Sequence, residues 1–120
     1  MLLFLLLACD QEPVAAGCES VPVPMADGRR LAADVCRPAG VEGPVPTVLV
    51  QTRYWRSFAL RVPDTPGRAP LGPRDGVGDA LLAAGYAFVV VDVRGTGASV
   101  GVWAAPFAPQ EVADAAVLLD

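Results

Sequence analysis

The sequence contains no histidine and no lysine among its 120 residues. The missing histidine removes the commonest general base, the usual proton carrier of a serine triad and the commonest metal ligand. All nine basic residues are arginines, they form no basic run alternating with aromatic residues, and the net charge is -4. That pattern is not typical of nucleic-acid binding. These absences exclude a self-contained Ser-His-Asp centre, and we expect no metal, no cofactor and no nucleic-acid partner.

Cysteine is scarce, and the first of the three cysteines follows an apolar start, MLLFLLLAC. This run is too short to span a bilayer but long enough for the core of a signal peptide. Leu6-Leu7-Ala8-Cys9 resembles the lipobox of bacterial lipoproteins, in which the cysteine carries the lipid. We therefore expect a lipoprotein signal peptide at residues 1–8, lipidation at Cys9 and a polar tether at 9–20. The alternative is a buried N-terminal strand.

The other two cysteines, Cys18 and Cys36, show none of the short paired spacings of a zinc or redox site. From this signal peptide we expect the protein outside the bacterial cytoplasm, as a membrane-anchored lipoprotein or in the periplasmic or extracellular space. Such a compartment permits a disulfide. A Cys18–Cys36 disulfide and two free thiols both remain open.

The remaining chain, residues 21–120, is long enough for one domain and is 53% hydrophobic over the whole sequence. Turn residues and apolar runs predict an alternation of strands and helices. We expect a β-hairpin over residues 21–38 around Asp27-Gly28, a strand over 47–51, a loop over 61–78, a helix over 79–84 that ends at Gly85, a strand over 88–93, and a helix that begins at Pro109.

The nearly unbroken apolar run FVVVDV, residues 88–93, is typical of a strand covered on both faces by helices, as in a parallel sheet. Left on the open edge of a small sheet, such a strand would invite pairing with other chains, so we expect further polypeptide to follow. In the last helix, Val112, Ala116 and Leu119 have the spacing of one apolar stripe.

The segment GASVG, residues 97–101, fits the G-x-S-x-G pattern of a nucleophile elbow, with Ser99 as the nucleophile. An elbow needs a helix directly after the serine, but VGVWAAPFAP follows instead. Ser99 therefore fits better as a turn serine that satisfies backbone groups. The spacing of Gly95, Gly97 and Gly101 also fails the G-x-G-x-x-G pattern, which argues against a nicotinamide-dependent oxidoreductase.

The longer phrase DVRGTGASVG closely resembles the D-x-R-G-x-G-x-S-x-G segment of the X-Pro dipeptidyl-peptidase and cocaine-esterase type of α/β-hydrolase. The matching residues are Asp92, Arg94, Gly95, Gly97, Ser99 and Gly101. The hairpin phrase ADGRRLAADVCRPAG, the strand phrase PTVLVQTRY, and Glu111 with Asp114 follow the order of the same family. The resemblance covers residues 21–120 and implies an α/β fold: the N-terminal part of an α/β-hydrolase sheet, truncated before the nucleophile elbow.

The resemblance also implies roles for residues near the expected active site. Tyr54 matches the tyrosine whose hydroxyl helps to hold the oxyanion, and the alternative is an aromatic that anchors a loop. Trp55 could line a substrate pocket or pack as an ordinary aromatic. Asp92 and Arg94 are two residues apart on an extended segment, so we expect them on the same side, paired or bound to loop carbonyls. With the glycines and Ser99 they would form a structural active-site floor.

The function that follows is a serine hydrolase acting on small ester, amide or X-Pro peptide substrates by acyl transfer. In that family the nucleophile, the acid and the histidine come later, so we expect these 120 residues to be inactive alone. The alternative is a non-catalytic, truncated surface lipoprotein or binding module.

Overall fold

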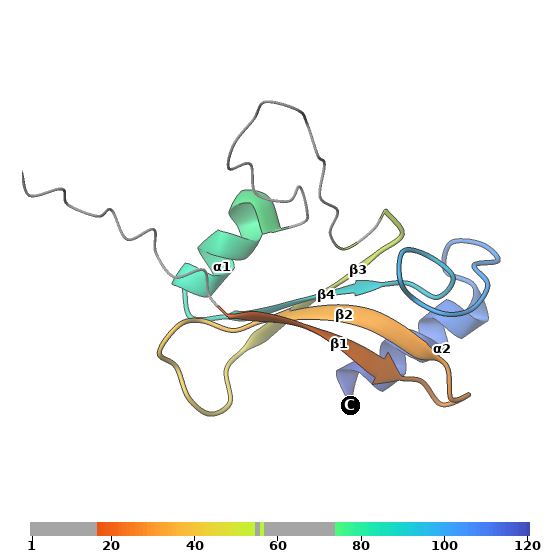
Figure 1. Ribbon diagram of the computed structural model, residues 1–120, viewed down its shortest axis with the longest axis horizontal. Coiled ribbons are helices and arrows are strands. Elements are labelled where there is room, and N and C mark those ends of the chain that lie inside the picture. The colour runs from red at the N-terminus through yellow and green to blue at the C-terminus, as the bar shows by residue number, and fades with distance from the viewer. Residues whose placement is uncertain (1–16, 55, 57–73) are drawn as a thin grey trace, which may run out of the picture.

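The computed structural model describes residues 17–54, 56 and 74–120 (Figure 1). The expected order of hairpin, strand, helix, strand and helix is confirmed, with small shifts at the ends of the elements. The elements are β1 (Cys18–Pro24), β2 (Arg30–Cys36), β3 (Thr47–Thr52), the π-helical turn η1 (Arg74–Gly78), α1 (Asp79–Ala83), β4 (Ala87–Asp92) and α2 (Pro109–Leu119). The predictions for the signal peptide, Cys9 and Trp55 lie outside the described residues.

One expectation for the long loop was wrong, because its last five residues form η1 and lead directly into α1. The sequence RDGVG lacks a helical apolar period, so it gave no signal for this turn. The other end of α1 agrees with the sequence. Gly85 has a φ of 87°, the left-handed conformation that commonly ends a helix at glycine.

The four strands form one mixed sheet in the order β1-β2-β4-β3. β1 pairs with β2 and β2 pairs with β4 in antiparallel fashion, whereas β3 and β4 are parallel. The apolar run of β4 therefore lies inside the sheet and not on an open edge. The chain crosses from β3 through α1 and returns on the side of the hairpin, so β4 fills the place between β2 and β3.

Helices cover both faces of the sheet, as the composition of β4 predicts (Figure 1). On one face Leu82 of α1 is buried with Phe88 and Val90. On the other face Val117 and Leu118 of α2 pack against a cluster of four buried residues, Met25, Leu31, Ala33 and Val91. Because β4 contributes residues to both clusters, it links the two halves of the core.

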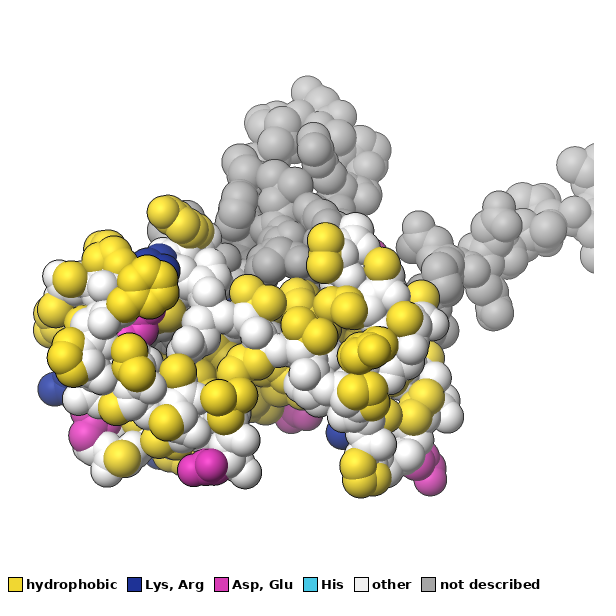
Figure 2. All heavy atoms as spheres, turned by 180° about the vertical axis from the view of Figure 1, so that it is seen from behind, with side chains coloured by type: hydrophobic (Ala, Val, Ile, Leu, Met, Phe, Trp, Pro, Cys, Tyr) yellow, Lys and Arg dark blue, Asp and Glu magenta, His cyan; other side chains and the backbone are white. Residues whose placement is uncertain are grey.

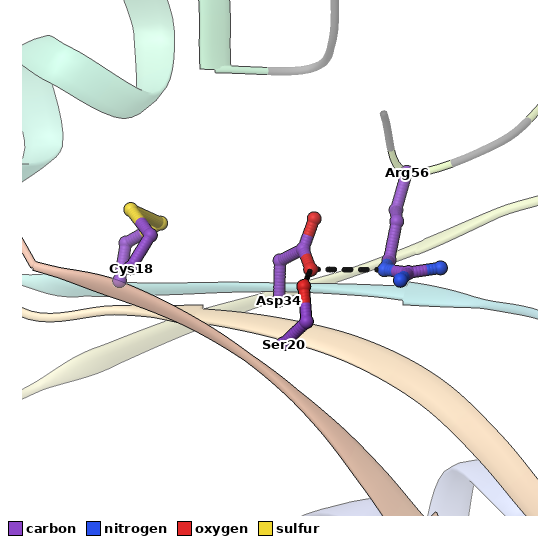
Figure 3. The surroundings of a disulfide bond; sticks show 5 residues. Cys18, Ser20, Asp34 and Arg56 are labelled. Carbon is purple, nitrogen blue, oxygen red and sulfur yellow. Dashed lines mark hydrogen bonds and ion pairs between the residues drawn. A yellow bond between two sulfur atoms is a disulfide. The ribbon is translucent and has the colours of Figure 1, made fainter. Parts of the chain in front are cut away.

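The hairpin is closed at both ends. At the turn, Gly28 has a φ of 78°, and the backbone N–H of Met25 donates to the carbonyl of Arg29 at 2.7 Å. At the open end, Cys18 and Cys36 are cross-strand partners with a Cα–Cα distance of 4.1 Å, and a disulfide joins them (Figure 3). A crosslink between residues 18 apart in sequence stabilises the fold by about 3 kcal/mol, mainly by restricting the unfolded chain.

Helix α2 turns a different face to the sheet from the one we expected. Val112, Ala116 and Leu119, the expected apolar stripe, are exposed. The buried residues of α2 are Glu111 and Asp114 instead. No helix among the described residues is long and apolar enough to cross a membrane.

Candidate functional site

The carboxyl ends of the parallel strands β3 and β4 meet at one edge of the sheet, where Thr52 is the register partner of Asp92. The backbone N–H of Val93 extends this pairing by donating to the carbonyl of Thr52 at 2.9 Å. In open α/β sheets, ligands bind outside the carboxyl ends of the strands. Tyr54 and the segment 92–101 follow these ends directly, so the site residues predicted from the sequence in this region lie together at the carboxyl ends of β3 and β4.

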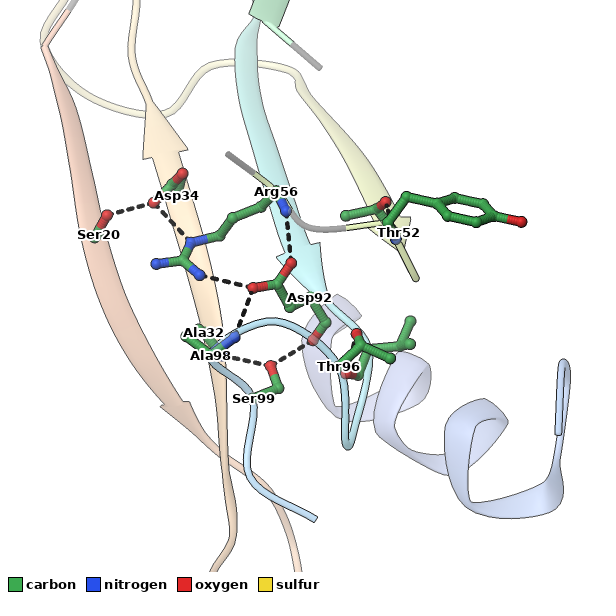
Figure 4. Close-up of polar contacts among 11 residues, drawn as sticks. Ser20, Ala32, Asp34, Thr52, Arg56, Asp92, Thr96, Ala98 and Ser99 are labelled. Carbon is green, nitrogen blue, oxygen red and sulfur yellow. Dashed lines mark hydrogen bonds and ion pairs between the residues drawn. The ribbon is translucent and has the colours of Figure 1, made fainter. Parts of the chain in front are cut away.

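Arg56 connects two buried carboxylates at this edge (Figure 4). Its Nε donates to Oδ1 of Asp34 at 2.9 Å, and its Nη1 donates to Oδ2 of Asp92 at 2.7 Å. The backbone N–H of Arg56 also donates to Oδ1 of Asp92, at 2.6 Å. Burial lowers the pKa of the Arg56 guanidinium, but the hydrogen bonds to Asp34 and Asp92 outweigh this and raise it. The cation therefore fixes the segment after β3 across β2 and β4.

Asp34 has a second donor from the first strand of the sheet. The hydroxyl of Ser20 in β1 donates to the same Oδ1 that accepts from Arg56 (Figure 3). The chain from Ser20 through Asp34 and Arg56 to Asp92 thus crosses three neighbouring strands, β1, β2 and β4. Charge-assisted hydrogen bonds of this kind are stronger than neutral ones.

Ser99 is 8% exposed, and its hydroxyl both donates and accepts a hydrogen bond within the protein (Figure 4). The Oγ donates to the carbonyl of Asp92 at 2.6 Å and accepts from the backbone N–H of Ala32 at 2.8 Å. Next to it, the N–H of Val100 donates to the carbonyl of Arg30 at 3.0 Å. These contacts belong to a turn serine that satisfies backbone groups, and they leave its hydroxyl poorly placed to attack a substrate.

Two glycines in the loop after β4 are required by close contacts. A Cβ built at Gly97 would lie 2.2 Å from Oδ2 of Asp92, and one at Gly95 would lie 2.3 Å from the backbone nitrogen of Trp103. Both glycines also have positive φ, 73° at Gly95 and 52° at Gly97. The loop can therefore fold over Asp92, where the backbone N–H of Ala98 donates to the same carboxylate at 3.1 Å.

The side chain of Arg94 does not pair with Asp92 but binds carboxylates on other elements. Our expectation that Asp92 and Arg94 lie on the same side of the strand was therefore wrong. Its Nε and Nη2 donate to the two carboxylate oxygens of Asp114 at 2.7 and 2.6 Å, and its Nη1 donates to Asp27 at 2.7 Å. Strand β4 ends at Asp92, so the side-to-side alternation of a strand does not extend to residue 94. Arg94 instead ties the hairpin turn and α2 to the end of the sheet.

The same contacts change the pKa values of this cluster. Hydrogen bonds to Asp114, and then to Asp27, raise the pKa of Arg94. In return, the hydrogen bond from Arg94, with help from the backbone N–H of Arg29, lowers the pKa of Asp27 below 3.8. Arg94 and Asp27 are therefore held in their charged forms at neutral pH. Gly101, the last residue of the matching phrase, lies against this cluster, since a Cβ there would be 2.6 Å from Cγ of Arg94.

The side chain of Tyr54 extends into solvent and is 86% exposed. Its backbone N–H donates to Oγ1 of Thr52 at 3.0 Å, which fixes a tight turn directly after β3. Its neighbour Arg53 forms an ion pair with Glu111 of α2 and lies over the ring of Phe107, 4.7 Å from the centroid. The segment that carries Tyr54 is thus anchored on one side by Arg53 and on the other by Arg56.

Sequence reasoning missed Arg56, Asp34 and Asp27 as members of this site. For Asp34 a signal existed, because this carboxylate stands in the otherwise apolar stretch LAADVC, on the same face of β2 as the buried Cys36. For Arg56 there was none, since it follows a strand in a segment without periodicity. In the part of the chain that the structure describes, no group of histidine, cysteine or acidic residues is arranged to hold a metal ion.

Comparison with known proteins places these motifs in one family. A sequence model described as X-Pro dipeptidyl-peptidase (S15 family) matches residues 27–120. Two curated relatives, each named "Putative serine esterase", come from Mycobacterium bovis and Mycobacterium tuberculosis and are each 40% identical over 108 residues. The match covers 82% of this chain but 17% of each relative, so the chain spans about a sixth of their length.

Solved structures share the fold. A CocE/NonD family hydrolase from Staphylococcus aureus superposes with a TM-score of 0.61 at 22% identity, over 84% of this chain and 19% of that one. An α-amino acid ester hydrolase superposes with a TM-score of 0.60 at 26% identity, over 99% of this chain and 22% of that one. The four strands and two helices therefore have the arrangement of the N-terminal part of an α/β-hydrolase fold.

Proposed function

Because the chain belongs to the X-Pro dipeptidyl-peptidase (S15) family, we propose that it forms one part of a serine hydrolase that cleaves ester or amide bonds, X-Pro peptide bonds included, by acyl transfer. The family match over residues 27–120 carries this proposal. The names of the curated relatives and of the α-amino acid ester hydrolase support ester chemistry. The substrate class is accordingly a small ester, amide or peptide.

In the proposed reaction a serine attacks the substrate carbonyl, and a histidine takes the proton and returns it to the leaving group. The chain has no histidine, and its buried Ser99 is used by Asp92 and Ala32. The nucleophile and its base would therefore come from polypeptide outside these 120 residues. Alone, the chain would have no hydrolase activity.

The contribution of this chain would be the oxyanion donor, the phenol of Tyr54. A phenol suits this role because it is neutral and donates one strong hydrogen bond. The exposed ring beside the carboxyl end of β3, on a segment anchored through Arg53 and Arg56, supports the assignment. The ion pairs of Arg56 with Asp34 and Asp92 would keep that segment from shifting when negative charge develops on the substrate.

Two assays test the function. First, the purified 120-residue chain should not turn over a nitrophenyl ester above the buffer rate. Second, a chimera in which this chain replaces the matched segment of the Mycobacterium bovis relative should hydrolyse the ester. In the chimera Tyr54→Phe should lower kcat by about 10²- to 10³-fold, the usual loss for one oxyanion donor. Tyr86→Phe, a change at another partly exposed tyrosine, is the control.

A folded chimera without activity would favour the alternative, a non-catalytic surface lipoprotein or binding module. Activity that survives Tyr54→Phe unchanged would remove Tyr54 from the mechanism while leaving the family's chemistry in place.

Export and lipid anchoring through Cys9 belong to the same proposal. The Cys18–Cys36 disulfide supports it, because disulfides persist in oxidising compartments outside the cytoplasm. In a bacterial host that modifies lipoproteins, radioactive palmitate should label the wild-type chain and not Cys9→Ser. A wild-type chain that stays unlabelled and cytoplasmic would reject the anchor.

A further inference from the structure

Two buried carboxylates share one guanidinium at the sheet edge that Tyr54 follows. Asp34 is 6% exposed and Asp92 is 1% exposed, and both bind Arg56. With two carboxylates and one guanidinium, this group holds an unbalanced negative charge. Elsewhere, over the surface seen in Figure 2, charged side chains are scattered among hydrophobic ones. A buried carboxylate gives up its hydration, so an unbalanced one calls for a reason other than stability.

Asp92 has a structural role that Asp34 lacks. The carboxylate of Asp92 accepts from the backbone N–H groups of Arg56 and Ala98, at 2.6 and 3.1 Å, and so shapes the loop after β4. Among the described residues, the donors to the carboxylate of Asp34 are two side chains, the hydroxyl of Ser20 and Nε of Arg56. The backbone of β2 is already held by its pairing with β1 and β4. What Asp34 adds is a fixed direction for the Arg56 side chain.

The surroundings of Asp34 would suit an apolar side chain. Asp34 stands in an otherwise apolar stretch of β2, on the same face as Cys36, which is fully buried. Without Asp34, Arg56 would keep Asp92 as its counter-charge at 2.7 Å. Buried charges that are replaced by well-packed apolar residues often leave stability unchanged or higher. The fold itself therefore does not require a carboxylate at position 34.

Tyr54, in contrast, depends on its backbone for its position. Its side chain is 86% exposed, so packing does not fix the ring. The backbone is held by the bond from the Tyr54 N–H to Oγ1 of Thr52 at 3.0 Å and, two residues later, by Arg56. A catalytic group displaced by about 1 Å can lose about 100-fold in rate. A second anchor for Arg56 would therefore matter more to catalysis than to folding.

We propose that Asp34 is a positioning residue of the hydrolase: it binds Arg56 from β2 and so holds in place the backbone that carries the Tyr54 phenol. Asp34 does not touch the substrate and acts through Arg56. This inference rests on the proposed function, in which Tyr54 donates to the oxyanion. It adds that the second carboxylate serves catalysis and contributes little to the stability of the fold.

The chimera with the Mycobacterium bovis relative tests the kinetic effect. Asp34→Leu keeps the branched shape of the side chain and removes its charge and its acceptors. We expect kcat to fall about 10- to 100-fold while KM stays within about 2-fold, because an oxyanion donor acts in the transition state. Glu19→Leu removes the same charge from an exposed position of β1 and is the matched control. It should leave kcat unchanged.

A double-mutant cycle shows whether Asp34 acts through Tyr54. In the Tyr54→Phe chimera, Asp34→Leu should lower kcat by less than about 2-fold, since the group that it positions is already gone. Equal losses with and without the phenol overturn the proposal, because Asp34 would then support the site in another way. So does an Asp34→Leu chain whose unfolding midpoint falls as far as that of Asp114→Asn, because Asp34 would then be structural.

Nuclear magnetic relaxation gives a readout that does not depend on activity. In the 120-residue chain, Asp34→Leu should lower the amide order parameters of Tyr54 and Arg56 from about 0.85 to about 0.6, while that of Val48 in β3 stays unchanged. Asp34→Asn keeps an acceptor for Arg56, so it should give intermediate values, and it replaces the leucine variant if that one does not fold. Order parameters of Tyr54 and Arg56 that equal those of wild type overturn the proposal.

The outcomes separate this inference from the proposed function. A loosened Tyr54 backbone in Asp34→Leu, beside a chimera whose rate ignores Tyr54→Phe, would sustain the positioning by Asp34 and reject Tyr54 as the oxyanion donor. A chimera whose kcat depends on Tyr54 but not on Asp34 would do the reverse.

Discussion

Arg94 binds Asp114 through two parallel hydrogen bonds, from Nε to Oδ2 at 2.7 Å and from Nη2 to Oδ1 at 2.6 Å. Both side chains are almost fully buried, with 5% and 3% of their surface exposed. The pair joins the end of β4 to α2, and it explains why the helix buries an acidic residue while its apolar stripe stays outside. A buried ion pair fixes orientation even where it adds little net stability, because a lone buried charge is so unfavourable.

Asp114→Asn should reduce the free energy of unfolding by about 3–5 kcal/mol, since it leaves the buried Arg94 without its main counter-charge. Denaturant unfolding followed by circular dichroism measures this. Arg29→Ala is the matched control, because Arg29 is half-exposed and its pair with Asp27 spans 3.7 Å. Its effect should stay within about 0.5 kcal/mol. Equal midpoints for Asp114→Asn and wild type would contradict the role given to the pair.

Ser99→Ala should reduce the free energy of unfolding by about 1–3 kcal/mol, because the half-buried N–H of Ala32 and the buried carbonyl of Asp92 both lose a partner. Thr47→Ala serves for comparison, since its exposed hydroxyl bonds the nearby carbonyl of Val45. A fluorophosphonate should label neither the wild-type chain nor the variant. Stoichiometric labelling of Ser99 would show that the serine is a nucleophile after all.

Gly97→Ala should destabilise the fold more than Gly40→Ala does. Both glycines have positive φ, 52° and 69°, so both changes strain the backbone by about 1–3 kcal/mol. Only at Gly97 does the new methyl group overlap the carboxylate of Asp92; nothing lies within 4 Å at Gly40. The difference between the two unfolding free energies therefore isolates the overlap. A difference near zero would mean that the loop moves freely away from Asp92.

The contribution of Asp27 to stability should disappear in acid. Its pKa in the folded protein lies below 3.8, first because Arg94 donates to it. A lowered folded pKa gives stability that is present above the unfolded value and is lost as the pH falls through the folded value. The difference in unfolding free energy between wild type and Asp27→Asn should therefore be constant near neutral pH and shrink below pH 3.8. Denaturant unfolding at a series of pH values measures it. A difference that persists in strong acid would contradict the ion pair.

Much of the fold could be predicted because it depends on local chemistry. Asp27-Gly28 specifies a tight turn, and Gly85 ends α1 in the left-handed conformation. The run FVVVDV predicts a strand covered on both sides, and α1 and α2 do cover the sheet on both sides. The position of β4 inside the sheet could not be predicted in the same way, because strand order depends on which edge the crossover reaches.

The site divides in the same manner. The phrase DVRGTGASVG predicts a structural loop that contains Asp92, and Gly97 is needed where that loop touches the carboxylate of Asp92. The partners could not be predicted. Arg56, from a segment without periodicity, pairs with Asp92, and Arg94 turns to Asp114 and Asp27.

The sequence by itself determined the order of the elements and the tight turns, since each depends on residue type and near neighbours alone. Its lack of histidine also excluded a Ser-His-Asp centre within these residues. The tertiary structure decided which face α2 buries and which charges pair. A period of apolar residues states only that a helix has an apolar face. Whether that face is buried depends on which charged side chains must be neutralised in the same space. Here the ion pairs of Asp114 with Arg94 and of Glu111 with Arg53 place the acidic face of α2 against the rest of the protein. These ion pairs join residues far apart in the sequence, so they form only in the tertiary structure.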